Sequence, residues 1–329
     1  MPLHVHQLSR ANPADELYFP AIARIHLAAW LTVPLMRAIY YGGPEAHPAY
    51  LSSMAERHLR AFREEDNCRF AVVVDDTLPA DEEVASKQDA GTGAVQGTTT
   101  VAAAAPKGKV IAAIKYYFIE PNPPAPSSAA SPSPTTTTAD SNQSSGGPSS
   151  ATAIRTWPAY SHVTLASAFW EQLVQARTRL TALLGRHVLV DNLYTDPGHH
   201  RRGAGGMLMR HACREADRCG WPSMLEASPK GIGVYESVGF RRFNPGGGNE
   251  EQDGSEIWVD LQRWENGGDK GVEFSKQRLK QELQSGGGRG EGWYCQVLMV
   301  RPAGSGGSSV GDQKEVVDIG KGEAAVVEP

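Results

Sequence analysis

The strongest constraint on the fold of this chain is a glycine-rich turn at residues 196–206, which reads Asp-Pro-Gly-His-His-Arg-Arg-Gly-Ala-Gly-Gly. An apolar run over 188–195 precedes it, and apolar residues at three- and four-residue spacing follow over 204–219. The pattern predicts a strand, a turn and an amphipathic helix. The first N–H groups of a helix lack intrahelical acceptors, its dipole is positive there, and glycine lets a ligand approach the backbone. We therefore expect the turn to bind a phosphate group, above all a pyrophosphate.

The segments around this unit predict an α/β (α+β) fold with a mixed sheet. Apolar residues at helical spacing predict one or two short helices over 19–40, interrupted at Pro34, with further helices over 52–62 and 165–184. The remaining expected elements are strands at 69–74, 109–119, 188–195, 223–227, 257–261 and 293–301, a strand starting at 240–243, a short helix at 231–238 and a charged helix near 274–283.

Composition indicates one domain over 1–302 that is interrupted by insertions. The 329 residues include 35 glycines and 22 prolines, concentrated in segments without hydrophobic periodicity. Such segments bury too little apolar surface to offset the entropy of ordering. The predicted insertions are 77–108 and 121–153, both disordered, and a Gly-rich segment over 244–292; residues 303–329 are predicted to be a disordered tail.

The charge and the cysteines exclude several protein classes. A formal net charge of -5 argues against a broad nucleic-acid or membrane-binding surface. The four scattered cysteines form no CxxC pair, and they are too few for a disulfide framework. The N-terminus lacks the apolar core of a signal peptide, and no apolar run is long enough to cross a bilayer. We expect a cytoplasmic or nuclear protein with neither a signal peptide nor a transmembrane segment.

Two motifs give the chain a specific resemblance. His200-Arg201-Arg202-Gly203-Ala204-Gly205 is similar to the [QR]-x-x-G-x-[GA] phosphate motif of the Gcn5-related N-acetyltransferase (GNAT) superfamily. Tyr235 with Gly239-Phe240 resembles the element that follows it in that superfamily. Fungal-type members with low-complexity insertions are the ones that the chain resembles most. The resemblance implies a centrally splayed sheet flanked by helices, with acetyl-CoA as cosubstrate.

The resemblance also implies a cofactor site. Backbone groups of Leu193, Tyr194 and Thr195 would pair with the pantetheine arm, and the turn would hold the pyrophosphate. His200 replaces the usual Gln or Arg, and Ser228 replaces an asparagine that contacts the pantetheine in many members. Since backbone N–H groups do most of the holding, neither change should abolish binding. The turn residues assigned to the cofactor are His200, Arg201, Arg202, Gly203, Ala204, Gly205 and Gly206.

Amine acylation by a thioester needs a proton acceptor for the amine and a proton donor for the leaving thiolate. Tyr235 matches the superfamily tyrosine that acts as this donor; the alternative is that its ring packs the short helix on the sheet. Asp191 and Glu226 lie on neighbouring strands, and either is a candidate base acting through water. The alternative is that they are hydrogen-bonded strand carboxylates.

Other residues support weaker hypotheses. His187, His199, His200 and His211 are close in sequence, but no carboxylate or cysteine stands at ligand spacing, so we expect no metal. The glycines at 203 and 205 could begin a GxGxxG dinucleotide-binding fingerprint, but Leu208 stands at the position of its third glycine, which argues against that kind of site. Arginines 210, 214 and 218 share one face of the predicted helix. That face could contact a phosphate, or it is simply the solvent-exposed face of the helix. Four aromatic residues are candidates for an acceptor pocket or for the core, namely Trp30, Trp157, Tyr160 and Trp170.

Together these features predict an N-acetyltransferase that moves acetyl from acetyl-CoA to a primary amine by direct transfer in a ternary complex. The expected partners are acetyl-CoA and an amine acceptor, either a small molecule or a peptide, with no nucleic acid, membrane or metal. Two alternatives stay open. One is a catalytically inactive CoA-binding module, and the other is an interaction protein that acts through its disordered segments.

Overall fold

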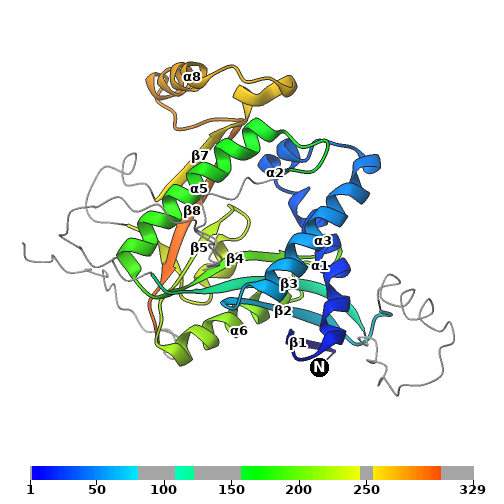
Figure 1. Cartoon of the computed structure of the whole chain (residues 1–329). Coiled ribbons are helices and arrows are strands. Elements are labelled where there is room, and N and C mark those ends of the chain that lie inside the picture. Colours follow the sequence, from blue (N-terminus) through cyan, green and yellow to red (C-terminus); the bar gives the residue numbers. More distant parts are fainter. Residues whose placement is uncertain (1, 81–107, 122–156, 245–254, 305–329) are drawn as a thin grey trace, which may run out of the picture.

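A single mixed β-sheet organises the protein in the computed structural model, which describes residues 2–80, 108–121, 157–244 and 255–304. Within these residues the strand order is β1-β2-β3-β4-β5-β8-β6, and β7 pairs with β8 (Figure 1). The strands are β1 (Leu3–Gln7), β2 (Cys68–Asp75), β3 (Lys109–Ile119), β4 (His187–Thr195), β5 (Ser223–Ala227), β6 (Arg241–Arg242), β7 (Glu256–Asp260) and β8 (Trp293–Arg301).

The centre of the sheet is splayed. Strands β4 and β5 are parallel, and they pair only from Val188 opposite Ser223 to Val190 opposite Leu225. Beyond Val190, β4 continues along β3 as far as Thr195, while β5 continues along β8. The two central strands therefore separate, and the edge of 191–195 that faces β5 has no strand partner among the described residues. The splayed sheet expected from the sequence is confirmed.

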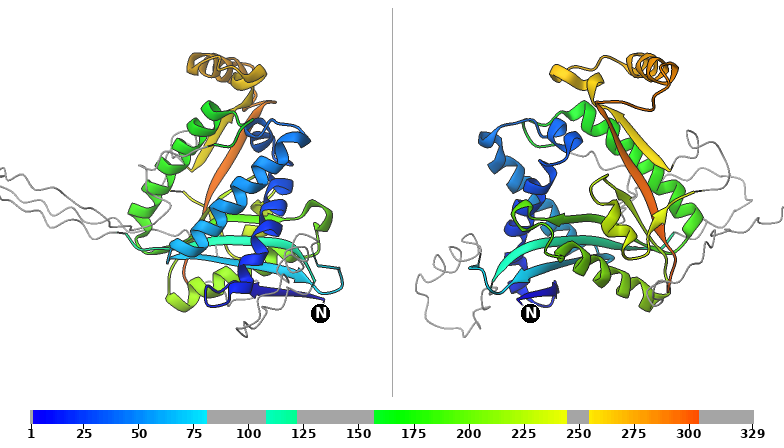
Figure 2. Two further views of the ribbon diagram at one scale, coloured as in Figure 1. Left: turned by 45° about the vertical axis from the view of Figure 1, so that its right-hand side comes forward. Right: turned by 180° about the vertical axis from the view of Figure 1, so that it is seen from behind.

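Helices cover both faces of the sheet. On one face lie α1 (Phe19–Trp30), α3 (His47–Glu64) and α5 (Val163–Leu184), and on the other lies α6 (Ala204–Cys219) (Figures 1 and 2). Alternate residues of β2 serve the two cores, with Val72 and Val74 packed on the α1 side and Ala71 and Val73 on the α6 side. This alternation follows from the two-residue repeat of a strand and explains the continuous apolar run in its sequence.

Most local predictions are confirmed. Strands 109–119, 223–227 and 293–301 have the expected bounds. Pro34 begins α2 (Pro34–Ile39) as its first residue, so 19–40 forms two helices, and the left-handed Gly220 (φ 67°) ends α6. The remaining elements are α7 (Ile232–Glu236), α8 (Val272–Gln284) and the 3₁₀ helices η1 (Pro13–Tyr18), η2 (Pro44–Ala46), η3 (Pro197–His199) and η4 (Leu261–Gly267).

Some expectations differ from the structure or lie outside it. Strand β1 was not expected from the sequence, yet it pairs with β2 along its whole length and extends the sheet. The predicted insertions 77–108 and 121–153 and the tail 303–329 fall almost entirely outside the described residues. The insertion 244–292 is described from residue 255 and contains β7 and α8, as its pattern indicated. Within the described residues, no helix combines the length and apolarity needed to span a membrane.

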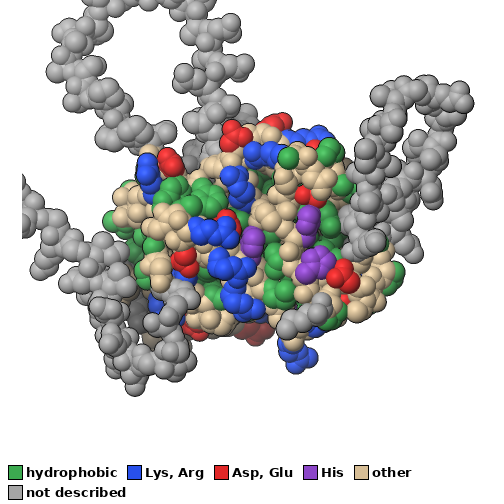
Figure 3. All heavy atoms as spheres, turned by 90° about the horizontal axis from the view of Figure 1, so that it is seen from below, with side chains coloured by type: hydrophobic (Ala, Val, Ile, Leu, Met, Phe, Trp, Pro, Cys, Tyr) green, Lys and Arg blue, Asp and Glu red, His purple; other side chains and the backbone are tan. Residues whose placement is uncertain are grey.

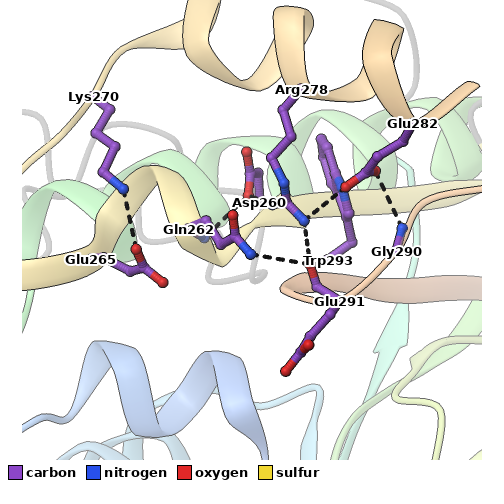
Figure 4. A network of polar contacts seen from close by, with 9 residues as sticks. All are labelled: Asp260, Gln262, Glu265, Lys270, Arg278, Glu282, Gly290, Glu291 and Trp293. Carbon is purple, nitrogen blue, oxygen red and sulfur yellow. Dashed lines mark hydrogen bonds and ion pairs between the residues drawn. The ribbon is translucent and has the colours of Figure 1, made fainter. Parts of the chain in front are cut away.

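Polar contacts attach α8 to the end of the β7–β8 pair (Figure 4). Helix α8 has no buried residue; Arg278 reaches from it to Asp260, and within the helix it pairs with Glu282 at 3.0 Å. Glu282 in turn accepts hydrogen bonds from the Gly290 N–H (3.2 Å) and from the Trp293 indole (2.7 Å). This subassembly lies at the end of the molecule opposite α6 (Figure 1). Helix α8 is held there by polar contacts and contributes no residue to the two cavities described below.

Candidate functional site

A cavity of about 490 Å³ opens where β4 and β5 separate. Its walls come from β4, β5, the start of α6, α7 and the C-terminal end of α1. Every site residue predicted from the sequence except Arg202 lines it. These residues are Asp191, Leu193, Tyr194, Thr195, His200, Arg201, Gly203, Ala204, Gly205, Gly206, Glu226, Ser228 and Tyr235. Residues from four separate elements thus meet in one space, although their individual roles stay predictions.

The glycine-rich turn presents an uncapped helix N-terminus to this cavity. Gly203 is the N-cap of α6 at φ 82°, and no side chain accepts from the first N–H groups of the helix. A Cβ at Gly205 would lie 3.3 Å from Thr195 Oγ1, so helix and strand approach closely here. Free N–H groups, the helix dipole and small residues are the elements of an anion site. The geometry is compatible with a phosphate group, and phosphate binding at this turn stays a prediction.

One ion pair and one backbone hydrogen bond fix the start of the turn. Asp196 accepts from the Gly198 N–H at 2.9 Å and pairs with Arg24 of α1 at 3.0 Å. Burial alone would raise the pKa of this carboxyl, but the hydrogen bond and the guanidinium hold it below its ordinary value. The carboxylate is therefore ionised at neutral pH. It joins the turn to α1, whose C-terminal end lines the same cavity.

Arg202 faces away from the cavity. It pairs at 2.5 Å with the buried Asp75 at the end of β2. The Thr77 hydroxyl, together with Arg202, lowers the pKa of Asp75 to about 2. Arg202 thus ties the turn to the sheet, and the structure does not place it with the other predicted cofactor residues. Spacing alone could not reveal this, because Asp75 is far away in the sequence.

Tyr235 lies on α7 with its ring packed edge-on to Phe240, at a centroid distance of 6.3 Å. A Cβ at Gly231 would come within 2.7 Å of the ring, so a glycine one turn earlier makes room for it. Burial, with a contribution from the Glu226 charge, raises the pKa of the hydroxyl to about 12. The hydroxyl is protonated at neutral pH and can donate a proton. The ring packs α7, as the structural alternative stated, while the residue also lines the cavity.

A buried arginine joins the two candidate bases. Arg177 of α5 donates two hydrogen bonds to Glu226, both at 2.8 Å, and one to Asp191 at 2.9 Å. Asp191 also accepts from Asn192 at 2.5 Å and lies 3.5 Å from the Lys115 ammonium. Protonation of either carboxylate would weaken its ion pair with Arg177. The hydrogen-bonded alternative for Asp191 and Glu226 matches this geometry.

Sequence reasoning missed Arg177, although a signal was present. The residue follows Leu173 by four positions and precedes Leu180 by three, so it occupies the buried stripe of the helix. Burial alone would lower the pKa of the Arg177 guanidinium, but the charges of Glu226 and Asp191 outweigh this effect and raise it. A charged side chain in an apolar stripe predicts a buried partner. The sequence could not identify which acids fill that role.

Two buried histidines form a second missed pair. His26 Nδ1 lies 2.8 Å from His58 Nε2, and the His26 ring stacks on Tyr194 at a centroid distance of 4.1 Å. Burial, reinforced by the nearby charges of Lys115 and Arg57, lowers the pKa of His58 well below its ordinary value. His58 is therefore neutral at physiological pH. Sequence reasoning gave neither His26 nor His58 a role.

A second cavity, of about 270 Å³, adjoins the first. Residues that line both are Trp30, Met36, Asp191, Asn192, Glu226 and Gln296. Of the aromatic residues proposed for an acceptor pocket, Trp30, Trp157 and Trp170 line this second cavity. Tyr160 does not; its side chain is exposed, and its carbonyl accepts a hydrogen bond from the Tyr50 hydroxyl at 2.6 Å. The two cavities meet at the Arg177-linked carboxylates.

The other residues considered from the sequence serve structural contacts. His187 bonds the Gly185 carbonyl at 2.8 Å, and His211 bonds Gln7 at 2.6 Å. Across the described part of the chain, no three His, Cys, Asp or Glu side chains are grouped to hold a metal ion. Arginines 210, 214 and 218 are exposed on α6. Lys and Arg side chains gather on the side of the molecule where α6 lies (Figure 3).

Comparison with known proteins identifies one segment. Residues 165–242 match the family model described as an acetyltransferase (GNAT) domain. The match runs from α5 through β4, the glycine-rich turn, α6, β5 and α7, and so includes both sequence motifs. No curated protein sequence matches the chain significantly.

Solved structures give weaker likenesses. Arylalkylamine N-acetyltransferase 2 from Aedes aegypti is 10% identical, with 92% of this chain and 99% of that chain covered and a TM-score of 0.48. A protein from Corynebacterium glutamicum described as histone acetyltransferase HPA2 and related acetyltransferase is 13% identical, with 92% of this chain and 97% of that chain covered and a TM-score of 0.37. The PaiA N-acetyltransferase from Thermoplasma acidophilum, in complex with coenzyme A, is 10% identical, with coverages of 75% and 94% and a TM-score of 0.35.

Proposed function

We propose that this protein is an acyl-CoA-dependent N-acyltransferase that moves acetyl from acetyl-CoA to a primary amine by direct transfer in a ternary complex. One observation carries the proposal. The unpaired edge of β4, the uncapped N-terminus of α6 and Tyr235 open into a single cavity, within the segment that matches the GNAT domain model. An extended thiol arm and a pyrophosphate need these two kinds of backbone group side by side.

In this proposal the N–H groups of Gly203 to Gly206 bind the pyrophosphate. Leu193, Tyr194 and Thr195 have backbone groups on the edge that β5 leaves, where an extended pantetheine arm adds like a strand. Ser228 follows β5 on the facing wall of the same cavity. This arrangement directs the thioester toward the border between the two cavities.

The chemistry requires attack of the amine nitrogen on the thioester carbonyl, after which the C–S bond breaks. Tyr235 protonates the leaving thiolate, because its hydroxyl keeps its proton at neutral pH and lines the cofactor cavity. Asp191 and Glu226 lie at the border of the two cavities, where the amine loses its proton. With Arg177 between them, they can receive that proton through water only by weakening an ion pair.

The test begins with cofactor binding by the full-length chain. Acetyl-CoA at about a hundred times its Kd should stabilise the protein by about 2.7 kcal/mol in a thermal shift experiment. Release of free CoA with a panel of primary amines then measures transfer. Absence of any stabilisation by acetyl-CoA would refute the proposal. Binding without amine-dependent CoA release would favour the inactive CoA-binding module.

A further inference from the structure

Aromatic side chains from several parts of the chain surround the second cavity. They are Trp30, Tyr40, Tyr117, Trp157, Phe169 and Trp170. Trp30 and Tyr40 lie in contact with a centroid distance of 5.5 Å, and the Arg177 guanidinium lies 5.7 Å from the Trp170 ring. Flat rings in a cavity of about 270 Å³ favour a small planar ligand. A folded chain or a long peptide needs a larger and more open surface.

The charges around this cavity do not balance. Three cationic side chains line it, Arg57, Lys115 and Arg177, against two carboxylates, Asp191 and Glu226. Arg177 contacts both carboxylates, and Lys115 lies 3.5 Å from Asp191, so these four charges are paired with one another.

Arg57 is the cation left over. Its Nε donates to the Ser53 carbonyl at 3.3 Å within its own helix, and no acidic side chain among the described residues pairs with it. The side chain is half-buried beside the neutral His58. A partly desolvated guanidinium without an acid favours a carboxylate ligand, which its planar fork can bind in bidentate fashion.

On the basis of the proposed N-acyltransferase function, we propose that the acceptor is a small primary amine that carries both an aromatic ring and a carboxylate, as an aromatic amino acid does. The aromatic ring occupies the second cavity, and the carboxylate pairs with Arg57. The amine nitrogen then lies toward the shared border, where the thioester arrives. Its lone pair forms the C–N bond, the C–S bond breaks, the nitrogen loses one proton and the thiolate gains one. The products are an N-acetyl aromatic acid and CoA.

This acceptor fits the charges better than the two broader alternatives. A cationic aromatic amine without the acid leaves Arg57 unpaired and adds a positive charge to a cavity that already has an excess of one. In a peptide, the α-carboxyl group of the first residue is part of an amide bond and carries no charge. The rest of the peptide chain would also have to leave a small cavity walled by aromatic rings. We therefore expect Arg57 to act as a specificity-determining residue.

Matched pairs of acceptors test the proposal with full-length protein and saturating acetyl-CoA. Phenylalanine is compared with 2-phenylethylamine, tryptophan with tryptamine, and leucine serves as the non-aromatic acid. We expect kcat/KM for each aromatic acid to exceed that for its decarboxylated partner by about ten- to a hundredfold, the range for a charge-assisted hydrogen bond. Leucine should fall below both aromatic acids. Arg57→Gln should remove the preference for the acid, whereas Arg60→Gln, an exposed arginine on the same helix, should keep it.

Calorimetric titration of phenylalanine and 2-phenylethylamine into the protein without cofactor measures the acceptor site independently. Tighter binding of phenylalanine that disappears in Arg57→Gln supports the site even if no transfer occurs. Equal or weaker binding of the acid overturns the proposal, and so does a preference that survives the Arg57→Gln change. Failure of acetyl-CoA to bind, with the acceptor preference intact, refutes the proposed function and not the acceptor site.

Discussion

Arg177 holds the centre of the site, and its removal gives the sharpest test of the structure. The guanidinium is buried and makes all of its three close contacts to Glu226 and Asp191. Arg177→Met preserves much of the side-chain volume but leaves the Glu226 carboxylate, whose side chain is 4% exposed, without its cation, while Asp191 keeps only Lys115. Removal of one member of a buried ion pair destabilises a protein by about 3–5 kcal/mol, because the remaining charge is uncompensated. We expect a loss of that size in the free energy of unfolding.

The double variant Arg177→Met/Glu226→Gln separates charge from packing. Glu226 receives two of the three hydrogen bonds, while Asp191 keeps Asn192 and Lys115. Neutralising Glu226 should therefore recover at least about 1 kcal/mol relative to Arg177→Met. The pH provides a second check. An orphaned buried carboxyl has a raised folded-state pKa, so the folded single variant takes up protons that its unfolded chain does not, and its deficit should shrink between pH 7 and pH 5.

Urea denaturation at pH 7 and pH 5 measures these differences, with Arg179→Met, an exposed position on the same helix, as the control. The control should change stability by less than about 0.5 kcal/mol. A loss below about 1 kcal/mol for Arg177→Met, or a double variant less stable than the single one, would show that the guanidinium does not compensate these carboxylates.

Three further predictions concern the turn, the proton donor and the histidine pair. Gly203→Ala places a Cβ at φ 82° and should cost about 1–2 kcal/mol and weaken acetyl-CoA binding, measured by thermal shift and titration; unchanged affinity would argue against the turn as the anion site. Tyr235→Phe should lower kcat by about 10²- to 10⁴-fold with unchanged stability, and a loss of stability alone would make the ring purely structural. His58 has a lowered folded-state pKa, so the unfolded chain binds the extra proton and stability falls as the pH drops below about 6.5. His58→Gln should reduce that fall between pH 7 and pH 5 in urea denaturation; an identical slope would contradict the assignment.

Sequence alone determined the features that depend on neighbouring residues. The apolar run, the glycine-rich turn and the amphipathic helix over 188–219 form the predicted strand, turn and helix, since period, capping and left-handed glycine conformations are local properties. For the same reason the bounds of 109–119 and 223–227 were correct. The second motif, Tyr235 with Gly239-Phe240, also indicated that Tyr235 would lie near the glycine-rich turn, although this rested on the family resemblance alone.

The tertiary structure decided what depends on distant residues. Leu3 and Val5 alternate with His4 and His6, but this pattern is too short to predict a strand by itself; β1 forms because β2 offers it a free edge. Arg202 turns to Asp75, Arg177 joins Asp191 to Glu226, and His26 meets His58, each across a long stretch of chain. A buried charge or ring nitrogen requires a partner, but its identity is set by how the layers pack. The sequence therefore determined the glycine-rich turn, and only the packing of α1, α3 and α5 on the sheet produced the aromatic cavity beside it.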